Sequence, residues 1–252
     1  MTTSTRSEAR VGRQQQELAA REVERRRTAA WAGGLVIVLL LAAIAVAVAL
    51  AAGGDRGEPD AQGPLVVPAN ATADGVVAVG QDEAPVTVTV FFDYLCPFCG
   101  RFEVANSARM EALVDSGRAR VEFRPMAFLD PRSEGTRYST RAANALATVS
   151  DGAPERTWAF HRALFHEQPA EGTPGLDDDR IEEIARRVGV PPAVTARFRQ
   201  GAFEPWVAQA TSAAFAAEVK GTPTVLVDGE PFEGDLYAPG ALADAVRTAG
   251  SR

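Results

Sequence analysis

The sequence predicts an α/β fold that contains a large all-helical insertion and that follows one N-terminal segment able to span a membrane. Two observations predict the α/β part: strand-like runs flank a helical stretch between residues 75 and 124, and strand signals return at residue 224. A third predicts the insertion, since residues 130–219 contain helical patterns and no convincing strand. Because a strand that follows a helix implies a crossover, we expect a parallel, right-handed unit in the sheet.

The composition narrows the class of protein. The chain has 252 residues, of which 46% are hydrophobic and 23% charged, as in globular and not disordered proteins. With a net charge of −7, the chain lacks the excess of basic residues that nucleic-acid binding requires, so we expect no nucleic-acid partner. Two cysteines cannot form a disulfide framework in a chain of this size, which leaves the pair free for chemistry.

Composition divides the first 74 residues into three segments. Residues 1–30 are a basic, arginine-rich tail, which we interpret as a solvated helix or disordered tail, with a partner-binding or lipid-headgroup segment as the alternative. Residues 31–52 carry no charge and as a helix would span about 33 Å, enough for the hydrocarbon layer. Residues 53–74, rich in Gly, Pro, Ala and Asp, predict a flexible linker.

We expect residues 31–52 to be an uncleaved transmembrane signal anchor. The preceding arginines should stay in the cytoplasm, so the domain at residues 75–252 should lie outside it, on a single-pass protein of the cell membrane. A cleaved secretory signal is the competing interpretation, because Ala49-Leu50-Ala51 resembles a small-residue cleavage site. A buried globular helix is a third interpretation. The first two interpretations both export the domain.

The domain begins with four elements around the cysteines. Residues 75–80 are a short strand candidate, and residues 86–92 are a stronger one, typical of a central strand. Residues 98–115 predict a helix, which Ser116-Gly117 ends, and residues 119–124 alternate as a strand. One face of the helix carries its larger apolar residues, namely Phe102, Ala105, Met110, Leu113 and Val114.

The insertion and the C-terminal elements follow in order. Helices are expected at residues 133–149, 154–165, 177–188, from Pro191-Pro192 onwards, and 204–219. Residues 224–227 then predict a strand, Asp228-Gly229 a hairpin turn, and the residues from Pro231 its partner strand. Residues 239–248 predict a closing helix.

The candidate active site is the run Cys96-Pro97-Phe98-Cys99 at the turn from strand to helix. Cys96 would lie at the helix N-terminus, where unpaired N–H groups and the macrodipole favour a thiolate. Pro97 suits the first helical turn, because its missing N–H has no partner there in any case. Cys99 lies within one turn, close enough for a disulfide. We therefore expect Cys96 to be the exposed nucleophile and Cys99 to be shielded.

A zinc site is the competing interpretation of the cysteine pair. The only histidines, His161 and His166, have a spacing found in zinc fingers, so a Cys2His2 site would use every Cys and His in the chain. However, about 60 residues separate the two halves, and the histidines do not share a helix face. We expect no metal, and interpret both histidines as surface or satisfied core residues.

Gly221-Thr222-Pro223 is the second supporting feature. A proline directly before a buried strand is awkward unless the bond before it is cis. Opposite the cysteines, such a loop would leave backbone groups of Thr222 free to pair with an extended substrate. From local sequence, a trans proline that starts the strand is an equal alternative.

Two segments, residues 92–102 and 219–229, together with Trp158-Ala159-Phe160-His161 and Gln168-Pro169, resemble the DsbA-like thiol–disulfide oxidoreductases of the thioredoxin superfamily. The resemblance implies a thioredoxin fold in which the helical block precedes the last two strands. It implies that Cys96 exchanges with substrate and Cys99 resolves. It also implies that Thr222, through a cis bond to Pro223, shapes the substrate groove.

One departure concerns the residues between the cysteines. The best-known family member has Pro-His there, whereas this chain has Pro97-Phe98, so we expect a less extreme thiolate and a weaker oxidant. Asp93, three residues before Cys96, is either a buried acid coupled to the pair or a solvated turn residue.

We expect a membrane-tethered, extracytoplasmic dithiol oxidase that acts on the thiols of exported proteins. The resemblance implies a membrane redox partner that reoxidises it; we expect no cofactor and a monomer. A reductase or isomerase of the same family is the first alternative, although residues 52–75 leave no room for the dimerisation domain that isomerases generally carry. A non-catalytic, membrane-anchored peptide-binding module with a structural disulfide is the alternative from another class.

Overall fold

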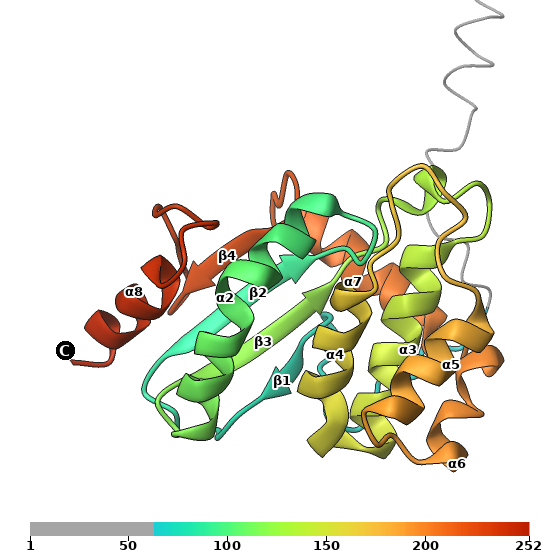
Figure 1. Ribbon diagram of the computed structural model, residues 1–252, viewed down its shortest axis with the longest axis horizontal. Coiled ribbons are helices and arrows are strands. Elements are labelled where there is room, and N and C mark those ends of the chain that lie inside the picture. Colours follow the sequence, from blue (N-terminus) through green and yellow to red (C-terminus); the bar gives the residue numbers. More distant parts are fainter. Residues whose placement is uncertain (1–62, 252) are drawn as a thin grey trace, which may run out of the picture. The chain divides into compact units, whose positions relative to one another are not determined.

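The computed structural model describes residues 63–251, at whose centre lies a five-stranded mixed sheet (Figure 1). Its strands are β1 (Val77–Val79), β2 (Thr87–Phe92), β3 (Arg120–Pro125), β4 (Thr224–Val227) and β5 (Glu230–Pro231). They lie in the order β1-β3-β2-β4-β5, with β2 and β3 parallel and all other neighbours antiparallel. The predicted parallel crossover and the predicted C-terminal hairpin are therefore confirmed.

The central strand β2 is buried on both faces, because its side chains alternate between two apolar layers. Val88 and Val90 face the helix α2 (Pro97–Asp115), where they meet Phe102. Phe91 points the other way and packs near Ala214 of helix α7 (Glu204–Ala216). Helix α8 (Ala241–Ala249) lies beside α2. Figure 1 shows α2 crossing in front of β2 and β3.

The helical insertion lies between β3 and β4, as the sequence predicted. Figure 1 shows α3, α4, α5 and α6 gathered beside the sheet. Helix α3 is its core, because alanines on almost every face let its neighbours approach closely. The elements of the insertion are η1 (Asp130–Arg132), α3 (Tyr138–Gly152), η2 (Pro154–Arg156), α4 (Thr157–His166), α5 (Asp178–Arg187), α6 (Pro192–Thr195), η3 (Phe198–Gln200) and α7.

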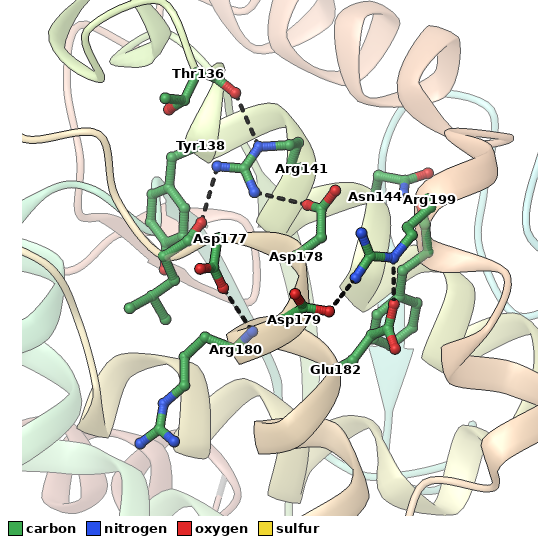
Figure 2. Close-up of polar contacts among 12 residues, drawn as sticks. Thr136, Tyr138, Arg141, Asn144, Asp177, Asp178, Asp179, Arg180, Glu182 and Arg199 are labelled. Carbon is green, nitrogen blue, oxygen red and sulfur yellow. Dashed lines mark hydrogen bonds and ion pairs between the residues drawn. The ribbon is translucent and has the colours of Figure 1, made fainter.

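Charged groups fasten α5 to the rest of the insertion (Figure 2). The Asp177 side chain caps α5 by accepting the N–H of Arg180 at 2.8 Å. Arg141 of α3 donates to the carboxylate of Asp178 at 2.7 Å, and Arg199 donates to Glu182 at 2.8 Å. Acidic groups also suit the positive end of the helix dipole, so these pairs serve the fold of the insertion.

The predicted linker ends before Asp74. Residues 69–73 are held against the insertion: the N–H of Ala69 donates to Asp151 at 3.0 Å, and Trp206 Nε1 donates to the Thr72 carbonyl at 2.8 Å. Ala71 also forms a β-bridge with Val77. These bonds correct the interpretation of residues 53–74 as linker throughout, because composition alone does not reveal partners supplied by distant helices.

The basic tail, the transmembrane anchor and residues 53–62 of the linker all lie outside the described residues. Within residues 63–251, no helix combines the length and the apolar character that a membrane crossing requires.

Candidate active site

The turn from β2 into α2 places both cysteines beyond the end of the central strand. Cys96 is the N-cap residue of α2 and Pro97 its first residue, as the sequence predicted. The N–H of Cys96 donates to the Asp93 carbonyl at 3.0 Å, and the N–H of Cys99 donates to the Cys96 carbonyl at 3.0 Å. The first turn of α2 thus begins at Cys96, and the N–H groups of Phe98 and Cys99 in this turn act as donors toward the Cys96 sulfur.

Both cysteines are free thiols and both are buried. Cys99 is 1% exposed, so its predicted shielding is confirmed, but Cys96 is only 4% exposed and its predicted exposure is wrong. The physical reason is the loop before β4, whose Thr222 carbonyl oxygen lies 3.3 Å from Cys96 Sγ.

The Thr222–Pro223 loop forms the wall opposite the thiols. Its peptide bond is cis, as the resemblance implied. The antiparallel pairing of Phe91 with Thr224 sets the loop beside the end of β2. The Thr222 hydroxyl oxygen is buried and has no hydrogen-bond partner among residues 63–251. That hydroxyl is free to donate to a thiolate.

The two thiols have opposite electrostatics. Donation by the Cys99 thiol, by Thr222 and by the N–H groups of Cys99 and Phe98 lowers the pKa of Cys96 to about 6, against an opposing effect of burial. Burial, reinforced by the neighbouring Cys96 sulfur, raises the pKa of Cys99 well above its usual range. The thiolate is therefore favoured at Cys96, whereas Cys99 favours the protonated thiol.

Asp93 is a buried acid, which decides between the two alternatives for this residue. It is fully buried and accepts hydrogen bonds from the N–H of Leu95 at 2.8 Å, the N–H of Leu129 at 3.0 Å and the Ser139 hydroxyl at 2.6 Å. Burial outweighs these three donors and raises the pKa of Asp93 to about 7. A buried carboxyl group three residues before Cys96 thus gains or loses its proton near neutral pH.

Phe98 lies on the open side of the site and is 51% exposed. The Arg101 guanidinium lies 5.8 Å from the centre of the Phe98 ring and 4.4 Å from that of Tyr237. Burial raises the pKa of Tyr237 against the opposing effect of the Arg101 charge. The rim therefore presents two aromatic rings and one cation to a substrate.

A family model described as thioredoxin matches residues 72–240, a range that contains all of these site residues. The chain belongs to the thioredoxin family. Within that family, the disulfide bond oxidoreductase DsbG of Mycobacterium tuberculosis is a solved relative with 30% sequence identity and a TM-score of 0.62. That similarity covers 72% of this chain and 90% of DsbG.

Curated relatives also match in sequence, and two of them illustrate the range. Serine/threonine-protein kinase PknE of Mycobacterium tuberculosis is 32% identical over 133 residues, which are 51% of this chain and 23% of PknE. Disulfide bond formation protein D of Bacillus subtilis is 32% identical over 130 residues, which are 50% of this chain and 56% of that protein. The chain thus spans about a quarter of the first relative and about half of the second. The solved relative and protein D confirm the predicted enzyme class, a thiol–disulfide oxidoreductase.

Sequence reasoning missed one side chain of this thioredoxin-like site. Gln168, in the loop after α4, donates through Nε2 to the carbonyl oxygens of Tyr94 at 3.0 Å and Cys96 at 2.8 Å. The resemblance already included Gln168, but nothing in the local sequence assigned it a contact with the cysteine turn.

His161 is a satisfied core residue, which was one of its predicted roles. It is fully buried, its Nδ1 bonds the Tyr94 hydroxyl at 3.0 Å, and its Nε2 bonds Glu103 at 3.0 Å. Both ring nitrogens are thus engaged, so His161 offers none to the zinc site considered above. His166 ends α4, beside a groove between α2 and α4.

Proposed function

We propose that this chain is a membrane-tethered, extracytoplasmic dithiol oxidase that introduces disulfides into exported proteins. One observation carries the proposal, namely the difference between the two thiols. The pKa of Cys96 is lowered and that of the buried Cys99 is raised, and the loop with the cis Thr222–Pro223 bond covers Cys96. A purely structural disulfide needs no such asymmetry. The relative from Bacillus subtilis, disulfide bond formation protein D, supports the same direction by its name.

The reaction begins from the Cys96–Cys99 disulfide. A substrate thiolate attacks Cys96 Sγ, which forms a mixed disulfide and releases Cys99 as a thiolate that takes up a proton. A second substrate thiolate then attacks the substrate sulfur of the mixed disulfide, which closes the substrate disulfide and releases the Cys96 thiolate. The substrate loses two electrons and the pair gains them. The low pKa of Cys96 makes it a good leaving group, which favours oxidation of the substrate.

Asp93 supports the proton balance of this reaction. Cys99 needs a proton when it becomes a thiol, and a buried carboxyl group with a pKa of about 7 is able to exchange one at neutral pH. Thr222 supplies a second function, because its carbonyl lies 3.3 Å from Cys96 Sγ and its hydroxyl has no partner among residues 63–251, so both groups stand where an extended substrate would run past Cys96.

The cellular setting is inferred from residues 1–52. The arginine-rich tail and the uncharged run at residues 31–52 support an anchor with its N-terminus in the cytoplasm. A domain exported in this way meets the oxidising compartment in which disulfides persist. The proposal includes a membrane redox partner that reoxidises the pair, no resident cofactor and a monomeric chain.

The test uses two single-cysteine variants of the full-length protein. With a reduced substrate peptide that contains two cysteines, Cys99→Ser should accumulate a mixed disulfide through Cys96, and Cys96→Ser should form neither mixed disulfide nor product. A Cys96→Ser variant that oxidises the peptide at the wild-type rate contradicts the proposal.

The direction of electron flow is tested by equilibration with glutathione. An oxidase requires a reduction potential well above that of thioredoxin, about −270 mV. A value near thioredoxin's assigns the chain to the reductase alternative.

A further inference from the structure

Gln168 connects the helical insertion to the turn that carries Cys96. One side-chain amide group holds two peptide carbonyls, those of Tyr94 and Cys96, at 3.0 and 2.8 Å. These carbonyls belong to the residues on either side of Leu95. The Gln168 amide therefore fixes the orientation of the backbone from Tyr94 to Cys96, the N-cap residue of α2.

The Cys96 carbonyl is the acceptor on which the first turn of α2 is built. It also receives the N–H of Cys99 at 3.0 Å and the N–H of Gly100 at 3.3 Å. In the same turn the N–H of Phe98 and the N–H of Cys99, which is shared with the Cys96 carbonyl, act on the Cys96 sulfur and lower its pKa. The orientation of this one peptide group thus governs how well the helix end supports the charge.

Gly100 shows how closely Gln168 fits. A Cβ atom built at Gly100 would lie 2.2 Å from Gln168 Oε1. The backbone of Gly100 is not in the positive-φ region, so its conformation does not require glycine. The position is therefore restricted by its contact with Gln168.

We propose that Gln168 is a positioning residue for exchange at Cys96: through this amide, the helical insertion holds the turn that aims the α2 N–H groups at the sulfur. The inference rests on the proposed function of the cysteine pair. Gln168 contacts neither sulfur, so it acts through the backbone of Cys96.

The first test removes the amide. In the reduced full-length chain, Gln168→Ala should raise the pKa of Cys96, read from the pH dependence of thiolate absorbance and of iodoacetamide alkylation, by about one unit. The equilibrium constant with glutathione should shift about tenfold toward the disulfide, a potential about 30 mV lower. Gln168→Met keeps the length and packing without the donors and should behave alike, which preserves the test should the alanine variant fold poorly.

Gln209→Ala is the matched control. Gln209 also donates its Nε2 to a backbone carbonyl, that of Ala73 at 2.9 Å, but on α7 and away from the cysteines. This control should leave the Cys96 titration at the wild-type position. If Gln168→Ala and Gln168→Met lower the melting temperature while the Cys96 titration stays at the wild-type position, the role of Gln168 is merely structural and the proposal is overturned.

A double-mutant cycle tests the contact itself. Gly100→Ala alone should raise the pKa of Cys96, because the new methyl group displaces the Gln168 side chain. In the Gln168→Ala background the same change should have no further effect. Additive effects overturn the proposal. Failure of the proposed function is distinguishable from failure of this inference. In the first case the wild-type chain itself would show no thiol–disulfide exchange, whatever the Gln168 variants do.

Discussion

Replacing Asp93 by asparagine should change how the stability of the protein depends on pH. The carboxyl group is fully buried and its pKa rises from 3.8 to about 7 on folding. Between these two values the folded chain binds about one proton more than the unfolded chain does. The free energy of unfolding therefore falls as the pH rises through this window, because unfolding releases this proton and a higher pH favours its release.

The magnitude follows from the two pKa values. A free energy of about 1.4 kcal/mol per pH unit over about three units amounts to about 4 kcal/mol. The asparagine variant lacks this term. All other groups titrate in both proteins. The difference in unfolding free energy between the wild type and Asp93→Asn therefore isolates the contribution of the Asp93 proton.

Urea unfolding of both reduced proteins at intervals from pH 4.5 to 7.5 measures this difference. We expect the wild type to lose about 1.4 kcal/mol per pH unit relative to Asp93→Asn up to about pH 7, and none beyond. Ser139→Ala removes a donor that lowers the pKa of Asp93, so in that variant the decline should continue to higher pH. Parallel curves for the wild type and Asp93→Asn would refute the reasoning.

Three further outcomes follow from the geometry. Alkylation of Cys96 should have its midpoint near pH 6. A midpoint near pH 9 would show that the donors around Cys96 do not stabilise its thiolate. Phe98→His should lower that midpoint by about one unit and raise the reduction potential, since an imidazolium group next to the thiolate stabilises it; an unchanged titration would contradict this. Gly175→Ala should destabilise the fold by about 3 kcal/mol in urea, because φ is +74° and the new Cβ would lie 2.4 Å from Tyr138. Gly135→Ala, with φ +82° and nothing within 4 Å, should cost only about 1–2 kcal/mol, and equal losses would show that the Tyr138 contact is irrelevant.

The elements with local signals could be predicted from the sequence. The helix expected at residues 98–115 is α2, one residue longer at its start, because Pro97 is tolerated in a first turn. The last helix of the insertion was expected to reach Val219, but it ends at Ala216, and Glu218 adopts the left-handed conformation at φ 60°. Helical periodicity continues through these residues, so the sequence pattern did not mark the end.

The polar environment of the site could not be predicted, because it depends on residues far along the chain. Asp93 is buried by partners 36 and 46 residues later, Leu129 and Ser139. Cys96 is covered by Thr222, 126 residues later. Local sequence therefore left the state of Asp93 open and made Cys96 too exposed. The cis bond before Pro223 was favoured only by the resemblance to a known family.

The pairing of β2 with β4 has a consequence for how this domain tolerates change. Phe91 opposite Thr224 is the register that sets the cysteine turn against the Thr222 loop, and it lies entirely within the sheet. The helices of the insertion connect the end of β3 to the start of β4. Substitutions on their outer surfaces therefore need not change the distance between the Cys96 sulfur and the Thr222 loop. A one-residue slip of β4, in contrast, would turn every side chain of the strand over and separate the two walls of the site. The pairing of β2 with β4 therefore fixes the distance between the cysteine turn and the Thr222 loop, and the outer faces of the insertion take no part in that pairing.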